Sequence, residues 1–393
     1  MEGIGWYTYE VLQRLVEKHP DDEFIFLFDR PYHPDFIFGK NVTPVVLFPQ
    51  ARHPLLFIWW FEWSVARALK RYKVDVFFSP DNFLCLNTAV PTLLVVHDMA
   101  YKHFSDNDKW VNRLYYRFFM PRFLKKAAHI VTVSHFVAAD LSAELGASAD
   151  KSAATGSDKS EATGVSVAYN GCRKEFTPLS REAQIEVKQK YTDDTSLWNI
   201  PKKSGDNREG GDFFLFVGAV HPRKNVHRLI AAFDMFKQQT FSPLKLVICG
   251  RFAWQTGLVK TAFDKAIHKK DIIFTGYVPD EDVPKLTASA FAVVYTSLFE
   301  GFGLPILEAL NCDVPVITSN VSSMPEVAGD AALLVNPESV SEIAEAMQLL
   351  IENVKLRQGL INRGRLQRQK FSWDKTAAII YQNLLKIVDK RLF

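Results

Sequence analysis

Residues 297–309 decide the fold, and their sequence is SLFEGFGLPILEA. They follow an apolar run at 291–295 that is typical of a buried parallel strand, and Pro305 suits the first turn of a helix. Gly301 and Gly303 let the backbone come close to a ligand, and the N–H groups of a helix start attract an anion. The stretch therefore predicts a strand, a glycine turn and a helix at the ligand-binding edge of a doubly wound sheet.

Two glutamates of this stretch, Glu300 and Glu308, lie eight residues apart. Glu300 precedes the glycine turn and Glu308 lies about one turn into the helix, so both carboxylates can face one crevice at the carboxyl ends of the strands. The alternative is that Glu300 caps the helix and that Glu308 is solvated. The spacing alone leaves both interpretations open.

On both sides of this stretch, short apolar runs alternate with helical patterns. In the C-terminal half, the predicted strands are 213–217, 244–249, 272–275, 291–295 and 314–318, and the predicted helices lie near 225–238, 257–269, 303–311 and 339–353. In the N-terminal half, the predicted strands are 23–28, 45–48, 74–79, 92–97, 129–133 and 165–169, and the predicted helices lie near 5–18, 57–71, 108–126 and 135–145. This order predicts an α/β protein with doubly wound parallel sheets.

The length of 393 residues suits two domains. Residues 146–164 are restricted to Ala, Ser, Thr, Gly, Asp, Glu and Lys, so they cannot bury apolar surface and we expect a mobile loop. A second weak stretch at 192–212 places the junction of the domains within 171–212. We predict domains over 1–180 and 181–372, followed by a closing helix over 373–393.

Composition excludes several classes of function. The net charge is +3 and neither half of the chain is strongly basic, which argues against a nucleic-acid binder. The four cysteines are dispersed, so we expect neither a zinc site nor a disulfide framework. The chain has no apolar run of about 18 residues and no signal-peptide pattern at its start, so we expect no spanning helix and a cytoplasmic location.

Two Asp-x-Asp patterns, at 106–108 and 280–282, raise the question of a metal site. Both precede predicted helices, where acidic side chains cap backbone N–H groups and suit the helix dipole. We therefore predict helix capping at both patterns and no metal site.

A second segment has the same strand, turn and helix order. Residues 216–225 are FVGAVHPRKN, and Arg223 and Lys224 lie where charge-assisted hydrogen bonds could hold a diphosphate. The alternative is a solvated basic pair, but cations are disfavoured at a helix N-terminus.

Two further segments lie in the N-terminal half. A buried strand at 92–98, TLLVVHD, ends in His97 and Asp98, which places the imidazole at the mouth of a crevice or, alternatively, makes it a structural group. Gly3-Ile4-Gly5 lies directly before a predicted helix, which by itself is a weak signal for a phosphate loop.

Together these four segments, in this order and over nearly the whole chain, resemble the retaining glycosyltransferases of family 4. The stretch 297–309 matches that family's Glu-x7-Glu element, and residues 318–332, TSNVSSMPEVAGDAA, are a second strong match. The resemblance implies the GT-B fold, in which two doubly wound Rossmann-like domains face a central crevice. The N-terminal domain would take the acceptor and the C-terminal domain the nucleotide sugar. The runs at 222–225 and 319–332 look most like those of bacterial mannosyltransferases that build surface polysaccharide such as lipopolysaccharide.

The resemblance implies roles for the two glutamates and the cations. Glu300 would contact hydroxyls of the donor sugar, and Glu308 would accept hydrogen bonds from the ribose hydroxyls. Lys224 would neutralise the diphosphate leaving group. Many family members carry an Arg directly after the glycine that matches Gly218, but this chain has Ala219 there. Arg223 would supply that charge instead.

The resemblance also assigns backbone and loop positions. The N–H groups of three residues would hold sugar and phosphate: Phe302, Gly303 and Leu304. Tyr277 and Val278 match a loop near the nucleobase.

In the N-terminal domain, His97 would reach the donor sugar, and Gly3 and Gly5 would give the backbone room near the phosphates. The family has an apolar strand before this glycine segment, whereas this chain begins at the segment. We predict that the start is truncated or mis-assigned, or that loss of this burial weakens the N-terminal domain.

The implied reaction is transfer of a hexose, with GDP-mannose as the first choice of donor, onto a glycan or lipid-linked saccharide. It needs no cofactor besides the nucleotide sugar. Retention would follow from same-face attack, with the departing phosphate helping to deprotonate the acceptor; double displacement through a carboxylate is the alternative. Three other functions stay open: transfer from a UDP-sugar, epimerase or phosphorylase activity on the same fold, and a non-catalytic nucleotide-sugar-binding relic.

Two stretches suggest a surface contact. Residues 55–63, LLFIWWFEW, predict a helix that is apolar on most faces and belongs either to the core or to an acceptor or membrane contact. Residues 113–126 carry five cations, interleaved with aromatic side chains and free of acids: Arg113, Arg117, Arg122, Lys125 and Lys126. A solvated helix face is the default, and docking on anionic lipid at the inner face of the plasma membrane is the hypothesis.

Overall fold

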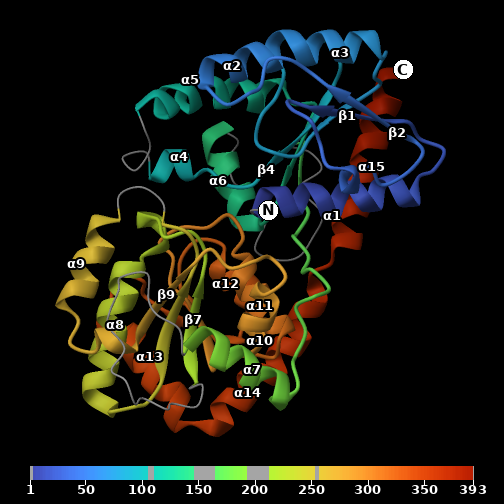
Figure 1. Cartoon of the computed structure of the whole chain (residues 1–393). Coiled ribbons are helices and arrows are strands. Elements are labelled where there is room, and N and C mark those ends of the chain that lie inside the picture. The colour runs from blue at the N-terminus through green and yellow to red at the C-terminus, as the bar shows by residue number, and fades with distance from the viewer. Residues whose placement is uncertain (1–2, 105–109, 146–163, 193–211, 253–255, 393) are drawn as a thin grey trace. The chain divides into compact units, whose positions relative to one another are not determined.

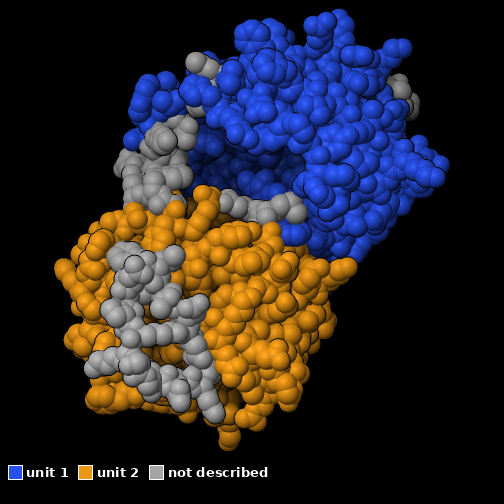
Figure 2. All heavy atoms as spheres, in the orientation of Figure 1, with its two compact units in different colours: residues 1–171, 372–393 blue, residues 172–371 orange. Residues whose placement is uncertain are grey.

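A computed structural model describes residues 3–104, 110–145, 164–192, 212–252 and 256–392. Residues 146–163 of the predicted loop, most of the weak stretch at 192–212 and the first Asp-x-Asp pattern lie outside these residues. The chain divides into two compact units (Figure 2): unit 1 comprises Met1–Gly171 and Ser372–Phe393, and unit 2 comprises Cys172–Phe371. Residues 172–180, which we assigned to the first domain, therefore belong to unit 2.

Unit 2 is built on one parallel sheet of six strands in the order β12-β11-β10-β7-β8-β9 (Figure 1). The strands are β7 (Phe213–Val217), β8 (Lys245–Cys249), β9 (Ile272–Gly276), β10 (Ala292–Tyr295), β11 (Val316–Ser319) and β12 (Ala332–Val335). The three central strands are buried along nearly their whole length, which explains why their sequences are apolar without alternation. The half-exposed edge strand β12 was not predicted, because its short run lacks that pattern.

Helices cover this sheet. They are α7 (Arg181–Thr192), α8 (Val226–Thr240), α9 (Gly257–Lys265), α10 (Val283–Ala288), α11 (Leu304–Asn311), α12 (Met324–Ala328), α13 (Val340–Glu352) and α14 (Val354–Gln367). Helices α8 and α13 pack on each other through apolar faces. The sequence missed three helices: α12 because it spans fewer than two turns, and α7 and α14 because they are mostly polar. Helix α10 follows the second Asp-x-Asp pattern, as predicted.

The order in which strands are added to this sheet changes sides between β7 and β10, and this position is the switch point of the sheet. Strands β8 and β9 are added on one side of β7, whereas β10, β11 and β12 are added on the other. The loops that leave β7 and β10 at their carboxyl ends therefore separate, and this is where doubly wound sheets bind ligands. The two predicted segments 216–225 and 297–309 meet at this point.

Unit 1 contains two separate parallel sheets, of strand orders β1-β2 and β3-β4-β5-β6. The strands are β1 (Phe24–Phe28), β2 (Val42–Val46), β3 (Phe77–Ser79), β4 (Thr92–Val96), β5 (His129–Thr132) and β6 (Val165–Val167). The expected single sheet of this domain is therefore split within the described residues, and β1 and β2 pair only with each other. The second predicted strand is shifted toward the N-terminus, since β2 includes Pro44.

The helices of unit 1 are α1 (Gly3–Lys18), α2 (Pro54–Trp59), α3 (Ala66–Arg71), α4 (Ala100–His103), α5 (Trp110–Lys126), α6 (His135–Leu145) and α15 (Trp373–Leu392). A π-helical segment, η2 (Trp60–Val65), joins α2 to α3, so the helix predicted at 57–71 is real but not uniformly α-helical. The C-terminal helix α15 packs against α1 and against β4 and β5 (Figure 1). In the described part of the chain, none of the helices combines the length and apolar content that a bilayer crossing requires.

Candidate functional site

The loops after β7 and β10 bring together a buried carboxylate, a lysine and a tyrosine. The Lys224 Nζ donates to Glu300 Oε1 and to the Tyr295 hydroxyl, each at 2.6 Å. The Tyr295 hydroxyl in turn donates to Glu300 Oε1 at 2.9 Å. Arg223 lies beside them, with one guanidinium nitrogen 3.7 Å from Glu300 Oε2. Glu300 is therefore not a helix cap, and Arg223 and Lys224 are not a solvated pair.

Electrostatics keeps this carboxylate ionised. Burial alone would raise the pKa of Glu300, but the charges of Lys224 and Arg223 outweigh it and lower that pKa to about 2. Burial, reinforced by the Glu300 charge, raises the pKa of Tyr295 well above its usual value. At neutral pH the cluster is thus a carboxylate, a neutral phenol and two cations, with a net positive charge.

Local geometry explains where the two cations point. The segment Pro222–Lys224 is a 3₁₀ turn whose start is capped by His221, since its Nδ1 accepts from the Arg223 N–H at 3.2 Å. Asn225 follows with φ of 60°, in the left-handed region that Asn tolerates. Its buried side chain donates to the Thr296 carbonyl at 3.0 Å, which ties this loop to the one after β10.

Hydroxyl groups from β11 and the segment after it hold the loop that carries Glu300. Thr318 and Ser319 donate to the carbonyls of Tyr295 and Ser297 at 2.8 and 2.6 Å. Ser323 donates to the carbonyls of Glu300 and Phe302 at 2.8 and 3.0 Å, and Ser322 accepts from the Glu300 N–H at 3.1 Å. The second matched motif, 318–332, therefore shapes the first.

Gly303 ends this loop and begins α11. Its φ is 99°, a conformation that side chains rarely adopt, and an added Cβ would lie 3.1 Å from Ile306. Leu304 opens the helix and Pro305 lies in its first turn, as the sequence predicts. First-turn N–H groups have no partner inside their own helix, so those near Phe302, Gly303 and Leu304 suit an anion.

The second glutamate, Glu308, lies one turn further along α11 and is partly buried. Burial raises the pKa of Glu308 to about 7, and the charge of Arg173 offsets part of that rise. Its carboxylate therefore differs from that of Glu300, because burial outweighs the nearby charge and favours the neutral form.

The remaining predicted residues of this domain follow strands at the same edge of the sheet. Gly218 follows β7, and Tyr277 and Val278 follow β9. Tyr277 is 72% exposed, whereas Val278 is buried. Gly250, after β8, must be glycine because an added Cβ would lie 2.0 Å from the Gly218 carbonyl oxygen, and this contact packs the turns after β7 and β8 together.

In unit 1, His97 lies at the end of β4, as predicted, and it is buried. Its Nε2 donates to the Pro80 carbonyl at 2.6 Å, because a carbonyl oxygen can only accept. Burial lowers the pKa of His97, although Pro80 and Asp98 act in the opposite direction. The imidazole is therefore neutral at pH 7, with its lone pair on Nδ1. The Tyr7 ring meets it edge-on, with ring centroids 4.7 Å apart.

Two expectations need correction. Gly3 and Gly5 do not form a loop before a helix: α1 begins at Gly3, so both lie in its first turn, one turn before Tyr7. In the second Asp-x-Asp pattern, Asp282 makes no side-chain cap on α10 but accepts from Lys190 at 2.7 Å and from the Tyr191 hydroxyl at 2.8 Å. Hydrogen bonds to these groups lower the pKa of Asp282 to about 2.

Sequence reasoning missed Tyr295, Asn225 and the serines at 322–323 as parts of the site. Tyr295 is the last residue of a buried strand, and its hydroxyl group in an otherwise apolar run was the available signal. Among the described residues, no cluster of three or more His, Cys, Asp or Glu side chains could hold a metal ion.

The parallel sheet of unit 2, with cations and a helix start at its switch point, defines a Rossmann-like domain suited to a phosphate-bearing ligand. Residues 199–367 match the family described as Glycosyl transferases group 1, and residues 1–154 match Glycosyltransferase Family 4. An O-antigen chain mannosyltransferase B from Escherichia coli is 30% identical over 79% of this chain and 74% of its own length. The chain belongs to the family-4 glycosyltransferases.

Other comparisons agree. The O-antigen chain mannosyltransferase RfbU from Salmonella typhimurium is 25% identical over 82% of this chain and 77% of its own length. Among solved structures, WaaG, a glycosyltransferase involved in lipopolysaccharide biosynthesis, superposes with a TM-score of 0.70 over 97% of this chain and 95% of that one, at 15% identity. Anabaena HepE in complex with UDP and glucose gives 0.68 over 95% and 94%, at 17% identity. The fold is GT-B and the protein is a glycosyltransferase.

Proposed function

We propose that this glycosyltransferase is a retaining mannosyltransferase that takes mannose from GDP-mannose and adds it to a growing surface polysaccharide. The supporting observation is the cluster of Glu300, Tyr295, Lys224 and Arg223 beside the start of α11. The choice of mannose rests on the names of the relatives from E. coli and Salmonella, both O-antigen chain mannosyltransferases.

The cluster suits departure of a nucleoside diphosphate. As the bond to the anomeric carbon breaks, negative charge grows on the diphosphate and positive charge grows on the sugar. Lys224, Arg223 and the N–H groups near Gly303 are fixed positive groups that stabilise the leaving group without reorganisation. Glu300 orients Lys224 and offers its second oxygen to a sugar hydroxyl.

Glu308 is the proposed partner of the ribose. An ionised carboxylate can accept hydrogen bonds from both ribose hydroxyls, whereas a protonated one has less acceptor capacity. Tyr277 and Val278 would lie near the nucleobase and Gly218 near the diphosphate. From unit 1, His97 would accept from a donor-sugar hydroxyl through Nδ1, since its Nε2 is engaged by Pro80.

Retention would follow from attack on the same face that the diphosphate leaves. Lys224 and Tyr295 both occupy Glu300 Oε1, which makes this carboxylate a poor nucleophile for a double displacement. The departing phosphate would take the acceptor's proton. The acceptor would be a glycan or a lipid-linked saccharide.

A thermal-shift screen tests the donor. The purified chain is heated with GDP, UDP or ADP and with their sugars, and the screen is repeated with Glu308→Ala and with the exposed control Glu345→Ala. At a 100-fold excess over the dissociation constant, we expect stabilisation of about 2.7 kcal/mol by GDP-mannose. The shift should shrink in Glu308→Ala alone. A shift with UDP-sugars instead would keep the family and discard the donor.

Product analysis tests the reaction. Incubation with GDP-mannose and an oligosaccharide acceptor should give a mannoside whose anomeric configuration, measured by NMR, equals that of the donor. An inverted product would contradict same-face attack. Binding of the donor without transfer to any acceptor would favour a non-catalytic role.

A further inference from the structure

The helix formed by α2, η2 and α3 exposes a stripe of large apolar side chains. Leu56, Trp59 and Trp63 are 41%, 56% and 57% exposed, and their spacing of three and four residues places them on one side of the helix. The rings of Trp59 and Trp63 lie with centroids 5.3 Å apart. The exposed cations Arg67 and Lys70 continue the same spacing along α3.

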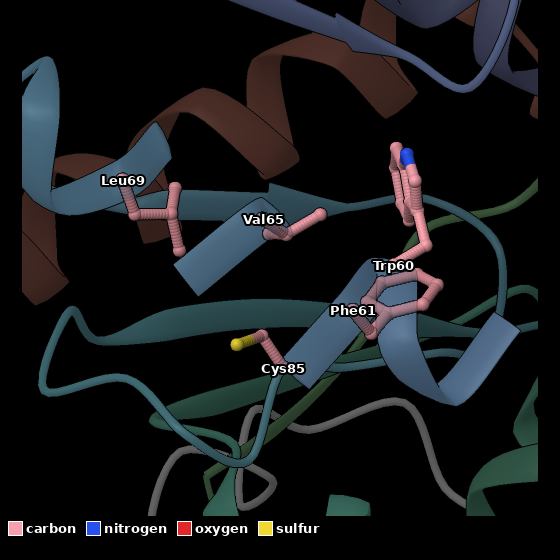
Figure 3. Packing of buried hydrophobic residues seen from close by; sticks show 5 residues of the cluster. All are labelled: Trp60, Phe61, Val65, Leu69 and Cys85. Carbon is pink, nitrogen blue, oxygen red and sulfur yellow. The ribbon is translucent and has the colours of Figure 1, made fainter. Parts of the chain in front are cut away.

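The opposite side of this helix already supplies its share of the core. Trp60, Phe61, Val65 and Leu69 are buried and pack together with Cys85 (Figure 3). The exposed stripe is therefore not needed to fasten the helix to unit 1. Single exposed hydrophobic residues are ordinary, but a row that includes two tryptophans indicates a contact surface.

The one acidic residue of this segment, Glu62, is hydrogen-bonded to a neighbouring loop. The Glu62 carboxylate accepts from the backbone N–H groups of Leu86 and Asn87 at 3.0 and 2.8 Å. These bonds fix the negative charge against the 86–87 loop. The exposed side of the segment thus carries tryptophan, leucine and cations.

The neighbouring helix α5 repeats the pattern. Trp110, Leu114 and Phe118 recur every four residues and are 74%, 61% and 50% exposed. Five cations are exposed on the same helix, which contains no acid: Arg113, Arg117, Arg122, Lys125 and Lys126. The Arg122 guanidinium lies over the Phe118 ring, 3.6 Å from its centroid, so cation and aromatic ring form one surface.

Helices α2 and α5 lie side by side in unit 1 (Figure 1). Between them the rings of Phe57 and Tyr115 meet with centroids 6.1 Å apart, which joins the inner sides of the two helices and leaves the two stripes outside. We call the exposed residues of both stripes the aromatic–basic face: Leu56, Trp59, Trp63, Trp110, Leu114, Phe118, Arg113, Arg117, Arg122, Lys125 and Lys126.

We propose that the aromatic–basic face docks unit 1 on an anionic lipid bilayer. Tryptophan side chains favour the boundary between headgroups and acyl chains, leucine and phenylalanine insert below it, and arginine and lysine attract anionic headgroups. The charge pattern selects this occupant: five cations interleaved with apolar anchors complement a surface of uniform negative charge. The inference goes beyond the transfer reaction and does not depend on the identity of the donor.

Vesicle flotation tests the proposal on the full chain. Vesicles of phosphatidylcholine alone are compared with vesicles containing about 30% phosphatidylglycerol. We expect flotation with the anionic vesicles, loss of it in strong salt, and little with phosphatidylcholine alone. Each cation near an anionic surface strengthens binding about fivefold, so reversal of the five α5 cations to Glu should weaken it by more than about 100-fold.

A matched control has the same change in net charge on exposed lysines of unit 2: Lys265, Lys269, Lys270, Lys355 and Lys370, each to Glu. It should float almost like the parent chain. The double variant Trp59→Ser/Trp63→Ser, which keeps every charge, should weaken flotation about tenfold or more. Circular dichroism and the nucleotide thermal shift show that each variant is folded; if the five-site variant is not, Arg113→Glu/Arg117→Glu replaces it.

Three outcomes would overturn the proposal. The first is absence of the parent chain from floated anionic vesicles. The second is flotation that survives charge reversal on α5 or depends equally on the control lysines. The third is a dimer, seen by light scattering without lipid, that the Trp59→Ser/Trp63→Ser change dissolves, because the face would then bind a second copy of the chain.

Discussion

Two buried tyrosines, one in each unit, differ in the hydrogen bonding of their hydroxyl groups. Tyr295 in unit 2 donates to Glu300 and accepts from Lys224. Tyr7 in unit 1 is fully buried against His97 and Trp373, but its hydroxyl has no hydrogen-bond partner among the described residues. Burial raises the pKa of both phenols far above the usual value, so both are neutral donors. The Tyr295 hydroxyl is thus satisfied within unit 2, whereas the Tyr7 hydroxyl has no partner among the described residues of unit 1.

The sheets of the two units also differ, in whether they are continuous. Unit 2 has one continuous sheet of six strands, and its switch point lies between two central buried strands. Unit 1 has its strands in two sheets, and β1 is half-buried along its whole length. Charges can be held rigidly only where the surrounding backbone is fixed, and the Glu300 cluster lies at loops of this continuous sheet.

Of the changes that test this comparison, Lys224→Ala should have the largest effect. It leaves the buried Glu300 carboxylate without its closest cation, so the unfolding free energy of unit 2 should fall by about 3–5 kcal/mol. Transfer activity should fall by about 10³-fold. Hydrogen exchange of peptides from β7 and β10 measures the first effect, and product formation measures the second. The exposed Lys265→Ala should change neither; a stable Lys224→Ala protein would contradict the pairing.

A smaller effect is expected for Tyr295→Phe. The change keeps the ring and removes a hydroxyl that bonds both Lys224 and Glu300, at a cost of about 1–3 kcal/mol in the stability of unit 2. Because Lys224 loses its second anchor, kcat should fall more than KM changes. Exchange of β10 peptides and steady-state kinetics provide the readouts. Unchanged kcat would show that Tyr295 only fills space.

Binding of the nucleotide should depend on pH through Glu308. Its pKa of about 7 means that the carboxylate gains its full acceptor capacity only above that pH, so GDP should bind more tightly at pH 8 than at pH 6, by up to about tenfold. Isothermal titration at several pH values measures this dependence. Glu308→Gln should remove the part of the slope centred near pH 7, and a slope that survives would belong to another group.

The smallest predicted effect is a gain in the stability of unit 1 rather than a loss. Tyr7→Phe removes a buried hydroxyl that lacks a partner, so unit 1 should become more stable by about 1 kcal/mol, whereas Tyr295→Phe destabilises unit 2. Exchange of α1 peptides measures it. Loss of stability would mean that the hydroxyl finds a partner in solution and that the two tyrosines are alike.

Sequence patterns predicted most strands and helices because buried parallel strands are short, apolar runs between helical periods. They placed Glu300, Lys224 and Arg223 at loops of one sheet edge, and the structure brings these three together. They failed for β12, α7, α12 and α14, which are short, polar or at an edge. They also misplaced the glycines Gly3 and Gly5, because a helix tolerates glycine in its first turn when later residues such as Tyr7 are well packed.

The sequence by itself determined the fold class and family and the candidate donor-binding residues, because strand spacing, glycine turns and motif order are local properties. Only the tertiary structure decided that Tyr295 is the third member of the Glu300 cluster and that Ser322 and Ser323 shape its loop. It also decided that Glu300 and Glu308 have opposite pKa shifts. The physical reason is that a pKa and a hydrogen bond depend on burial and on distances between residues far apart in the chain, which no local pattern encodes.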